Sequence, residues 1–323
     1  MRMARIKLTG RGAVYHCMTR VVGGQALLGS VEKETLRRML WQQAAFSGLQ
    51  VVTYCLLANH FHVLLRVPNP TPVPDAELLA RASRFYGRRS PFVSALHTAF
   101  EHSGSLPESL RIGLLDRMGD VSAFMKELKQ RFSRWFNGRH ARFGTLWAER
   151  FKSVLVEDQP GAVRAVAAYV DLNGVRAGWV EDPKDYRWCG YAEAVAGHAL
   201  AREGLASFHA TGDWAEAGRE YREVLLVTSG RAGRSGKVAV EAGTLRRELR
   251  RGGELSLGEV LRLRVRYFTD GVALGSRGYV NGVFAEFRDR FGARRRTGAR
   301  PLRGVTALKD LASLRDLRVD AVG

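Results

Sequence analysis

The sequence predicts an α+β fold in which an antiparallel, ferredoxin-like sheet carries helices on one face. The order of segments leads to this prediction: residues 13–67 contain strand, helix, strand and strand patterns, and residues 120–178 continue with helix, strand and helix. The hydrophobic fraction of 46% in 323 residues is typical of a globular protein with one large or two ordinary domains.

The first half of the predicted sheet contains a helix between strands. Ser30 is the expected N-cap of a helix that runs to about Phe46, with Gly48 just beyond its end. A bend at residues 58–59 separates two of the strands. Three apolar, β-rich runs predict the strands: residues 13–20, 51–57 and 60–67.

The second half follows a proline-containing break. Residues 69–118 are helical in pieces and are interpreted as an insertion. Asp120 is the expected cap of a helix over residues 121–137, and residues 151–157 alternate as a strand. Pro160 then begins a helix that reaches about Val175. These segments complete a core domain over residues 1–192.

The C-terminal part differs in composition. Residues 193–245 are interpreted as a connecting region with a basic linker, and residues 246–323 as a basic, mainly helical, DNA-binding region. Residues 230–304 hold 18 Lys and Arg against 7 Asp and Glu. The helices predicted there, at residues 256–267 and 276–291, resemble a helix-turn-helix in outline.

The net charge of +19 predicts attraction to polyanions, of which nucleic acid is the first candidate and an anionic membrane surface the alternative. No apolar run approaches the roughly 20 residues that span a bilayer, and no signal-peptide pattern is present. We therefore expect a cytoplasmic, nucleoid-associated protein without a membrane partner. Its three widely spaced cysteines predict no disulfide framework.

Two histidines in a predicted strand are candidate metal ligands. Alternation places His60 and His62 on one face and Phe61 on the other. A solvated polar face is the alternative, but the surrounding run is otherwise apolar. Neutral imidazole is a common metal ligand, so the pair favours a cation site.

A tyrosine and an asparagine lie one helical turn apart about a hundred residues later. Tyr169 is either a core aromatic or a nucleophile, and Asn173 supplies an amide oxygen as a candidate third metal ligand. A phenol is a weak nucleophile at neutral pH unless a cation polarises the phosphate that it attacks. Together the two motifs favour cleavage of a nucleic-acid strand through a covalent tyrosine intermediate.

Several basic residues are candidate contacts to nucleic acid. Arginines between residues 134 and 150 alternate with aromatic residues, as in sites that grip single strands by charge and stacking. Solvated arginines and core aromatics are the alternative for about half of them, and a core histidine is the alternative for His16. The predicted contacts are His16, Arg20, Arg134, Arg139, Arg142, Arg150, Lys152 and Arg176.

Four segments resemble the single-tyrosine HUH transposases, and within them the REP-associated tyrosine transposases, relatives of the insertion-sequence transposases that act on single-stranded DNA. The resemblance covers roughly residues 11–67 and 119–192. Gly174 stands where the family often has proline, and residues 69–118 are longer than in compact members. The matching segments are YHCMTR, LLANHFHVLLRVP, GTLWAERFKSVLVE and AAYVDLNGVRAGWVEDPKDYRWCGY.

The resemblance implies a ferredoxin-like core and a Mg²⁺ or Mn²⁺ ion held by His60 and His62, with Asn173 as a further ligand. It implies that Tyr169 forms a 5′-phosphotyrosine link and frees a 3′-OH. The implied partner is single-stranded DNA with hairpins, and the protein is expected to be a monomer or homodimer. Two alternatives stay open: a nucleic-acid-binding regulator that no longer cleaves, and a metal hydrolase that uses water as its nucleophile.

Overall fold

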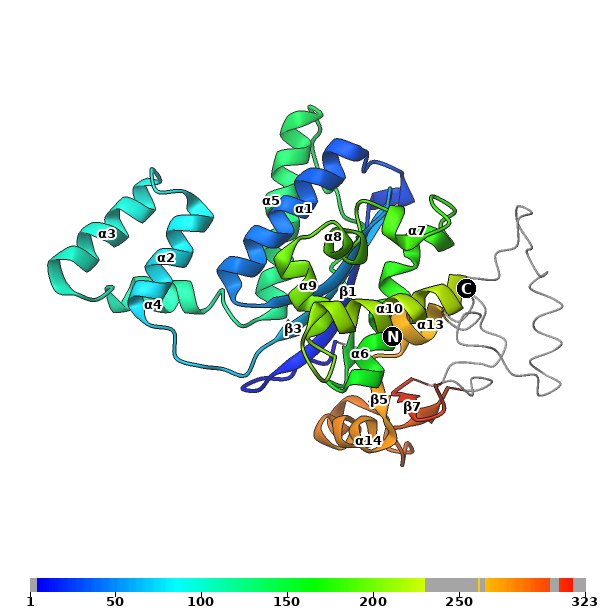
Figure 1. Ribbon diagram of the computed structural model, residues 1–323. Helices are drawn as coiled ribbons and strands as arrows, with labels where there is room; N and C mark the ends of the chain where they lie inside the picture. The colour runs from blue at the N-terminus through cyan, green and yellow to red at the C-terminus, as the bar shows by residue number, and fades with distance from the viewer. Residues whose placement is uncertain (1–4, 230–260, 262–264, 303–307, 316–323) are drawn as a thin grey trace, which may run out of the picture.

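The computed structural model describes residues 5–229, 261, 265–302 and 308–315. It has a mixed α+β fold built around one seven-stranded sheet (Figure 1), which confirms the predicted fold class. The spatial order of the strands is β2-β3-β1-β4-β5-β7-β6, and all pairs are antiparallel except β4 with β5. The strands are β1 Ala13–Arg20, β2 Gln50–Leu56, β3 His60–Val67, β4 Lys152–Val156, β5 Ala273–Ser276, β6 Arg300–Pro301 and β7 Leu311–Ser313.

Helices cover both faces of this sheet, which corrects the expectation that they lie on one face. One apolar cluster joins α1 and α5 to one face of the strands, and a second joins α6, α8, α9 and α10 to the other. The helices are α1 Ser30–Ser47, α2 Asp75–Tyr86, α3 Pro91–Ser103, α4 Glu108–Leu115, α5 Val121–Arg139, α6 Pro160–Asp171, α7 Asn173–Arg176, α8 Gly190–Val195, α9 Ala199–Ala206, α10 Trp214–Ser229, α13 Val265–Asp270 and α14 Arg277–Glu286.

Local chemistry explains where the helices begin and end. The Asp120 carboxylate accepts from the backbone N–H groups of Ser122 and Ala123 and so caps α5. Gly48 ends α1 with a φ of 72°, a left-handed conformation that glycine adopts without strain. Ser30 is the first residue of α1 rather than its cap, which is Gly29. The helix predicted to reach Val175 is divided into α6 and α7.

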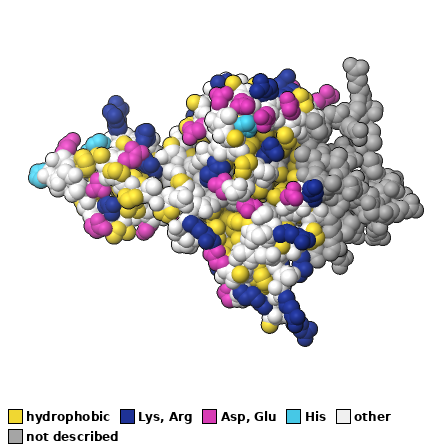
Figure 2. All heavy atoms as spheres, turned by 60° about the horizontal axis from the view of Figure 1, so that its bottom comes forward, with side chains coloured by type: hydrophobic (Ala, Val, Ile, Leu, Met, Phe, Trp, Pro, Cys, Tyr) yellow, Lys and Arg dark blue, Asp and Glu magenta, His cyan; other side chains and the backbone are white. Residues whose placement is uncertain are grey.

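The insertion forms a small helical lobe that extends from the body (Figure 1). Helices α2 to α4 share an apolar cluster with Phe46 of α1, so the lobe has a core of its own and is anchored to the sheet domain through that helix. Figure 2 shows Lys, Arg, Asp and Glu side chains interspersed over this lobe. The helical prediction for residues 69–118 is therefore confirmed for most of the segment.

The C-terminal region is not only helical. Strand β5 lies between α13 and α14, and β5, β6 and β7 extend the sheet of the core domain. The segment between the two helices predicted at residues 256–267 and 276–291 thus contains a strand, so the helix-turn-helix outline does not hold. Most of the helix predicted at residues 256–267, and all but the first two residues of the basic linker predicted at residues 228–237, lie outside the described residues. None of the helices described here has the length and apolarity to cross a bilayer.

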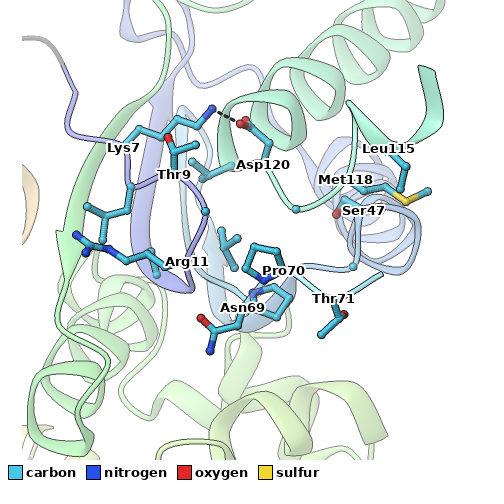
Figure 3. Close-up of a pocket in the computed structure, with 18 of the residues that line it drawn as sticks. Lys7, Thr9, Arg11, Ser47, Asn69, Pro70, Thr71, Leu115, Met118 and Asp120 are labelled. Atoms are coloured by element: carbon cyan, nitrogen blue, oxygen red, sulfur yellow. Dashed lines mark hydrogen bonds and ion pairs between the residues drawn. The ribbon is translucent and has the colours of Figure 1, made fainter. Parts of the chain in front are cut away.

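A cavity of about 310 Å³ lies between residues 7–11, which precede β1, and residues 68–73, which connect β3 to α2 (Figure 3). Lys7 pairs across it with Asp120, and Ala13 at the start of β1 lines it. The candidate residue His60 pairs with Arg20, at the other end of that strand. Eight residues of strand separate the two ends by roughly 25 Å. This cavity is therefore remote from the predicted metal ligands.

Candidate active site

The sheet register places the two predicted metal ligands on one face. His60 pairs with Arg20 and His62 with Met18 across β1 and β3, while Phe61 packs against Trp147 on the opposite face. The strand period therefore has the consequence expected from the sequence. His60 is partly buried and His62 is buried.

His16 of β1 and Tyr169 of α6 meet His62 on this face. The ring centroid of Tyr169 lies 5.7 Å from that of His62 and 5.7 Å from that of His16, both in edge-on arrangements. The rings of His16 and His62 are stacked at 5.1 Å, and His60 lies 5.1 Å from His62. The structure thus brings the tyrosine and the histidine motif together from elements about a hundred residues apart.

Hydrogen bonds fix which ring nitrogens carry protons. The Nδ1–H of His16 donates to the carbonyl of Phe268 at 2.8 Å, so neutral His16 accepts at Nε2 from the Nδ1–H of His62 at 2.9 Å. The Nδ1–H of His60 donates to the side-chain oxygen of Asn59 at 2.6 Å. Each of His60 and His62 therefore keeps its Nε2 lone pair for a ligand.

Burial keeps these imidazoles neutral. It lowers the pKa of His16 and of His60 to about 4, and it lowers that of His62 well below its usual range, with the nearby Arg176 acting in the same direction. A neutral imidazole whose other nitrogen donates to a fixed acceptor is the form that binds metals. His60 and His62 therefore fit a divalent cation by donor chemistry.

Asn173 is hydrogen-bonded through both atoms of its amide group. Its amide nitrogen donates to the carbonyls of Tyr169, at 2.9 Å, and Val170, at 3.1 Å, and its side-chain oxygen accepts from Arg176. Asn173 is buried one turn from Tyr169, as the spacing predicted, but its oxygen is already paired. Among the residues that the structure describes, no group of three or more His, Cys, Asp or Glu side chains is arranged as a metal site.

Arg176 lies against the phenol of Tyr169. A guanidinium nitrogen donates to the phenol oxygen at 3.2 Å, and the guanidinium carbon is 4.4 Å from the ring centroid. Burial raises the pKa of Tyr169 above its usual value, and the charge and hydrogen bond of Arg176 offset only part of this rise. The cation therefore favours the phenolate that a nucleophilic tyrosine needs.

Phe268 of α13 covers Tyr169. The two rings stack with centroids 4.7 Å apart, and only 2% of the Tyr169 side-chain surface is exposed. The carbonyl of Phe268 is also the acceptor of the His16 hydrogen bond. Phe268 thus contacts both the candidate nucleophile and the histidine cluster.

Asp171 fastens the tyrosine helix to its surroundings. Its buried carboxylate accepts from the hydroxyls of Thr53 and Tyr221, both at 2.7 Å, and from the backbone N–H of Tyr191 at 3.1 Å. Burial raises its pKa to about 6 despite these donors. The contacts join α6 to β2, α8 and α10, and so fix the position of Tyr169.

The predicted nucleic-acid contacts occupy different places. His16 is fully buried with both nitrogens bonded, which is the core-histidine alternative, so it does not face nucleic acid in this structure. Arg20 and Lys152 are exposed and lie close to the histidines in the sheet. Arg20 pairs with His60, and Lys152 pairs with Met18, which in turn pairs with His62. The others, apart from Arg176, lie on or after α5: Arg134, Arg139, Arg142 and Arg150.

Two contributors to the site were not predicted as such. Asp171 had a sequence signal, because it is a single carboxylate within an otherwise apolar helix face. Phe268 had none, because it follows Tyr169 by 99 residues in the C-terminal region and no periodic pattern links the two.

No protein-family model and no curated protein matches this chain. One solved structure similar to it is described as "Structure of the REP associates tyrosine transposase bound to a REP hairpin". The TM-score is 0.39 at 14% sequence identity, over 61% of this chain and 85% of that chain. A similarity of this size carries no argument for function, which must come from the side chains.

Proposed function

We propose that the protein is a metal-dependent endonuclease and strand transferase that cuts single-stranded DNA near hairpins through a 5′-phosphotyrosine intermediate. The observation that carries the proposal is the meeting of Tyr169 with His62 and Arg176 in one buried site. A phenol, a cationic hydrogen-bond donor and neutral imidazoles are the groups that this reaction requires. The motifs shared with the single-tyrosine HUH transposases support the same assignment.

Each group has a role in the proposed reaction. Tyr169 gives its phenolic proton to solvent and its oxygen attacks the phosphorus, so an O–P bond forms while the P–O3′ bond breaks and the 3′ oxygen takes up a proton from solvent. Arg176 donates to the phenol oxygen and holds it at the reacting position. His60 and His62 would hold Mg²⁺ or Mn²⁺, which supplies Lewis-acid stabilisation of charge on the phosphate.

The reaction needs no external energy source, because the phosphotyrosine bond conserves the free energy of the bond that was cut. A 3′-OH of the same or another strand can attack this link and rejoin the DNA. Sealing in this way would make the enzyme a transposase as well as a nuclease.

A binding protein that no longer cleaves is the second candidate, because Tyr169 is buried beneath Phe268. A cleavage assay separates the two. Labelled single-stranded hairpin DNA is incubated with the protein and Mg²⁺ or Mn²⁺, and the products are denatured before electrophoresis. Cutting that requires metal supports the nuclease, and tight binding without cutting supports the regulator.

A further inference from the structure

A groove lined by basic residues lies away from the tyrosine site. A groove of about 980 Å³ runs between α5 and residues 145–151. One face of α5 lines it, with polar residues spaced three or four apart, as neighbours on a helix surface must be. These residues are Ser122, Lys126, Lys129 and Ser133.

The groove is strongly cationic. Five Lys and Arg residues line it, and Glu149 is its one acidic lining residue among those described. Lys126, Arg134 and Arg150 are exposed, and none of the three has a carboxylate within ion-pair distance in the part of the chain that the structure describes. Lys129 donates from Nζ to the backbone carbonyl of Glu149 at 2.7 Å.

The C-terminal region extends this charge. Arg5 lines the groove, and its guanidinium donates to the carbonyl of Phe151 at 2.8 Å. Arg290 donates in turn to the carbonyl of Arg5 at 2.9 Å. Arg290 therefore lies next to Arg5 and adds a further positive charge near the groove.

The groove and the tyrosine lie on opposite faces of the sheet. Trp147 and Phe151, which line the groove, belong to the apolar cluster beneath α1 and α5, whereas Tyr169 belongs to the cluster on the other face. The segment of a ligand that occupies the groove cannot lie against the phenol as well, whereas a neighbouring segment of a long ligand can. The groove is thus separate from the candidate active site.

We propose that this groove binds the phosphodiester backbone of DNA, in a segment that flanks the strand cut at Tyr169. The cations and the hydroxyls of Ser122 and Ser133 are donors suited to phosphate oxygens. Trp147 and Phe151 are each only 6% exposed, so neither offers a ring face for base stacking. The groove therefore binds by charge rather than by sequence. Its placement relative to a cleaved strand rests on the proposed function.

The test compares two double variants of the full chain that each remove two exposed cations. Lys126→Gln with Arg134→Gln alters the groove, and Arg88→Gln with Arg89→Gln alters the insertion lobe by the same charge. Fluorescence anisotropy measures the affinity for a labelled 20-nucleotide single strand of thymidylate and for a 20-base-pair duplex, across a range of salt concentrations.

We expect the groove variant to bind about tenfold more weakly near 100 mM salt. The slope of log K against log salt should fall by about 1.4 for the single strand, since each lost phosphate contact contributes about 0.7. The lobe variant should change affinity less than twofold. A loss confined to one probe supports the proposal and identifies single-stranded or duplex backbone as the occupant. Unchanged affinity for both probes, or an equal loss in the lobe variant, would overturn it.

The same variants separate this proposal from the proposed function. Tyr169→Phe should bind both probes as the unaltered protein does. The groove variant, saturated with DNA, should still form the covalent adduct if the tyrosine reaction is correct. An unaltered protein that forms no adduct would reject the nuclease and leave the groove measurements valid.

Discussion

Arg176 reaches back along the chain from α7 to the phenol of Tyr169 in α6, donating to its oxygen at 3.2 Å while the guanidinium carbon lies 4.4 Å from the ring centroid. The same side chain donates to the amide oxygen of Asn173. One cation thus connects the proposed nucleophile to the residue that the sequence predicted as a metal ligand. A metal bound by Asn173 would share this oxygen with the Arg176 guanidinium.

Replacing Arg176 should slow the reaction without unfolding the protein. In Arg176→Met the phenol loses its charged donor, so we expect the rate of adduct formation to fall about 10²- to 10³-fold, the usual cost of removing one such donor. The rate is measured under saturating DNA and metal. Arg187→Met is the matched control, since 72% of the Arg187 side chain is exposed. Equal rates in the two variants would exclude the role given to Arg176.

Asp171 should be a major contributor to stability. In Asp171→Ala two hydroxyls and a backbone N–H lose their buried acceptor, and we expect the free energy of unfolding to fall by about 3 kcal/mol. Tyr221→Phe removes one donor of the same network and should cost about 1 kcal/mol. Urea denaturation at neutral pH measures both. A cost below 1 kcal/mol for Asp171→Ala would show that the network does not hold α6.

The histidine pair should bind a cation. We expect Mn²⁺ to bind the unaltered protein at one site by isothermal titration calorimetry, and this site to be lost in His62→Gln and weakened at least tenfold in His60→Gln. His102→Gln, on an exposed part of α3, should bind as the unaltered protein does. Undiminished binding in both site variants would place the cation elsewhere.

The groove should lose affinity for DNA at alkaline pH. Burial lowers the pKa of Lys129 to about 8, with the charge of Arg5 acting in the same direction. The lysine is therefore charged below pH 8 and loses its charge as the pH rises through that value, whereas an exposed lysine keeps its charge to about pH 10. We expect affinity to fall between pH 7.5 and 9, by roughly threefold to fivefold at fixed salt. The Lys129→Met variant should bind DNA more weakly at pH 7.5, and its affinity should not fall between pH 7.5 and 9. If its affinity falls as that of the unaltered protein does, the pH dependence belongs to a group other than Lys129.

Local patterns predicted much of the core domain. Strands β1 and β3 have the predicted bounds, and β2 is shifted by one residue, because alternation and breakers are local properties. The strand and helix periods also predicted which neighbours share a face, His60 with His62 and Tyr169 with Asn173. The one-sided arrangement of helices was wrong, because alternation does not reveal that both faces of a strand are covered.

The remaining features depend on contacts distant in sequence. Phe268 covers Tyr169, and β5 pairs in parallel with β4, although about a hundred residues or more separate the members of each pair. The Asn173 oxygen was predicted to bind a metal ion, but in the structure it accepts a hydrogen bond from Arg176. Residue spacing alone does not show which of these two partners it has. The groove along α5 likewise appears only when the helix lies against residues 145–151.

The most direct test of the account asks whether Tyr169 becomes covalently attached to DNA. The protein is incubated with Mn²⁺ and a labelled single-stranded hairpin, denatured and digested with protease, and the modified peptide is sequenced by mass spectrometry. The account predicts a 5′-phosphorylated nucleotide on Tyr169, which disappears without metal and in Tyr169→Phe, while that variant keeps its fold and its affinity for DNA. Cutting that persists in Tyr169→Phe, or an adduct on another residue, would contradict it.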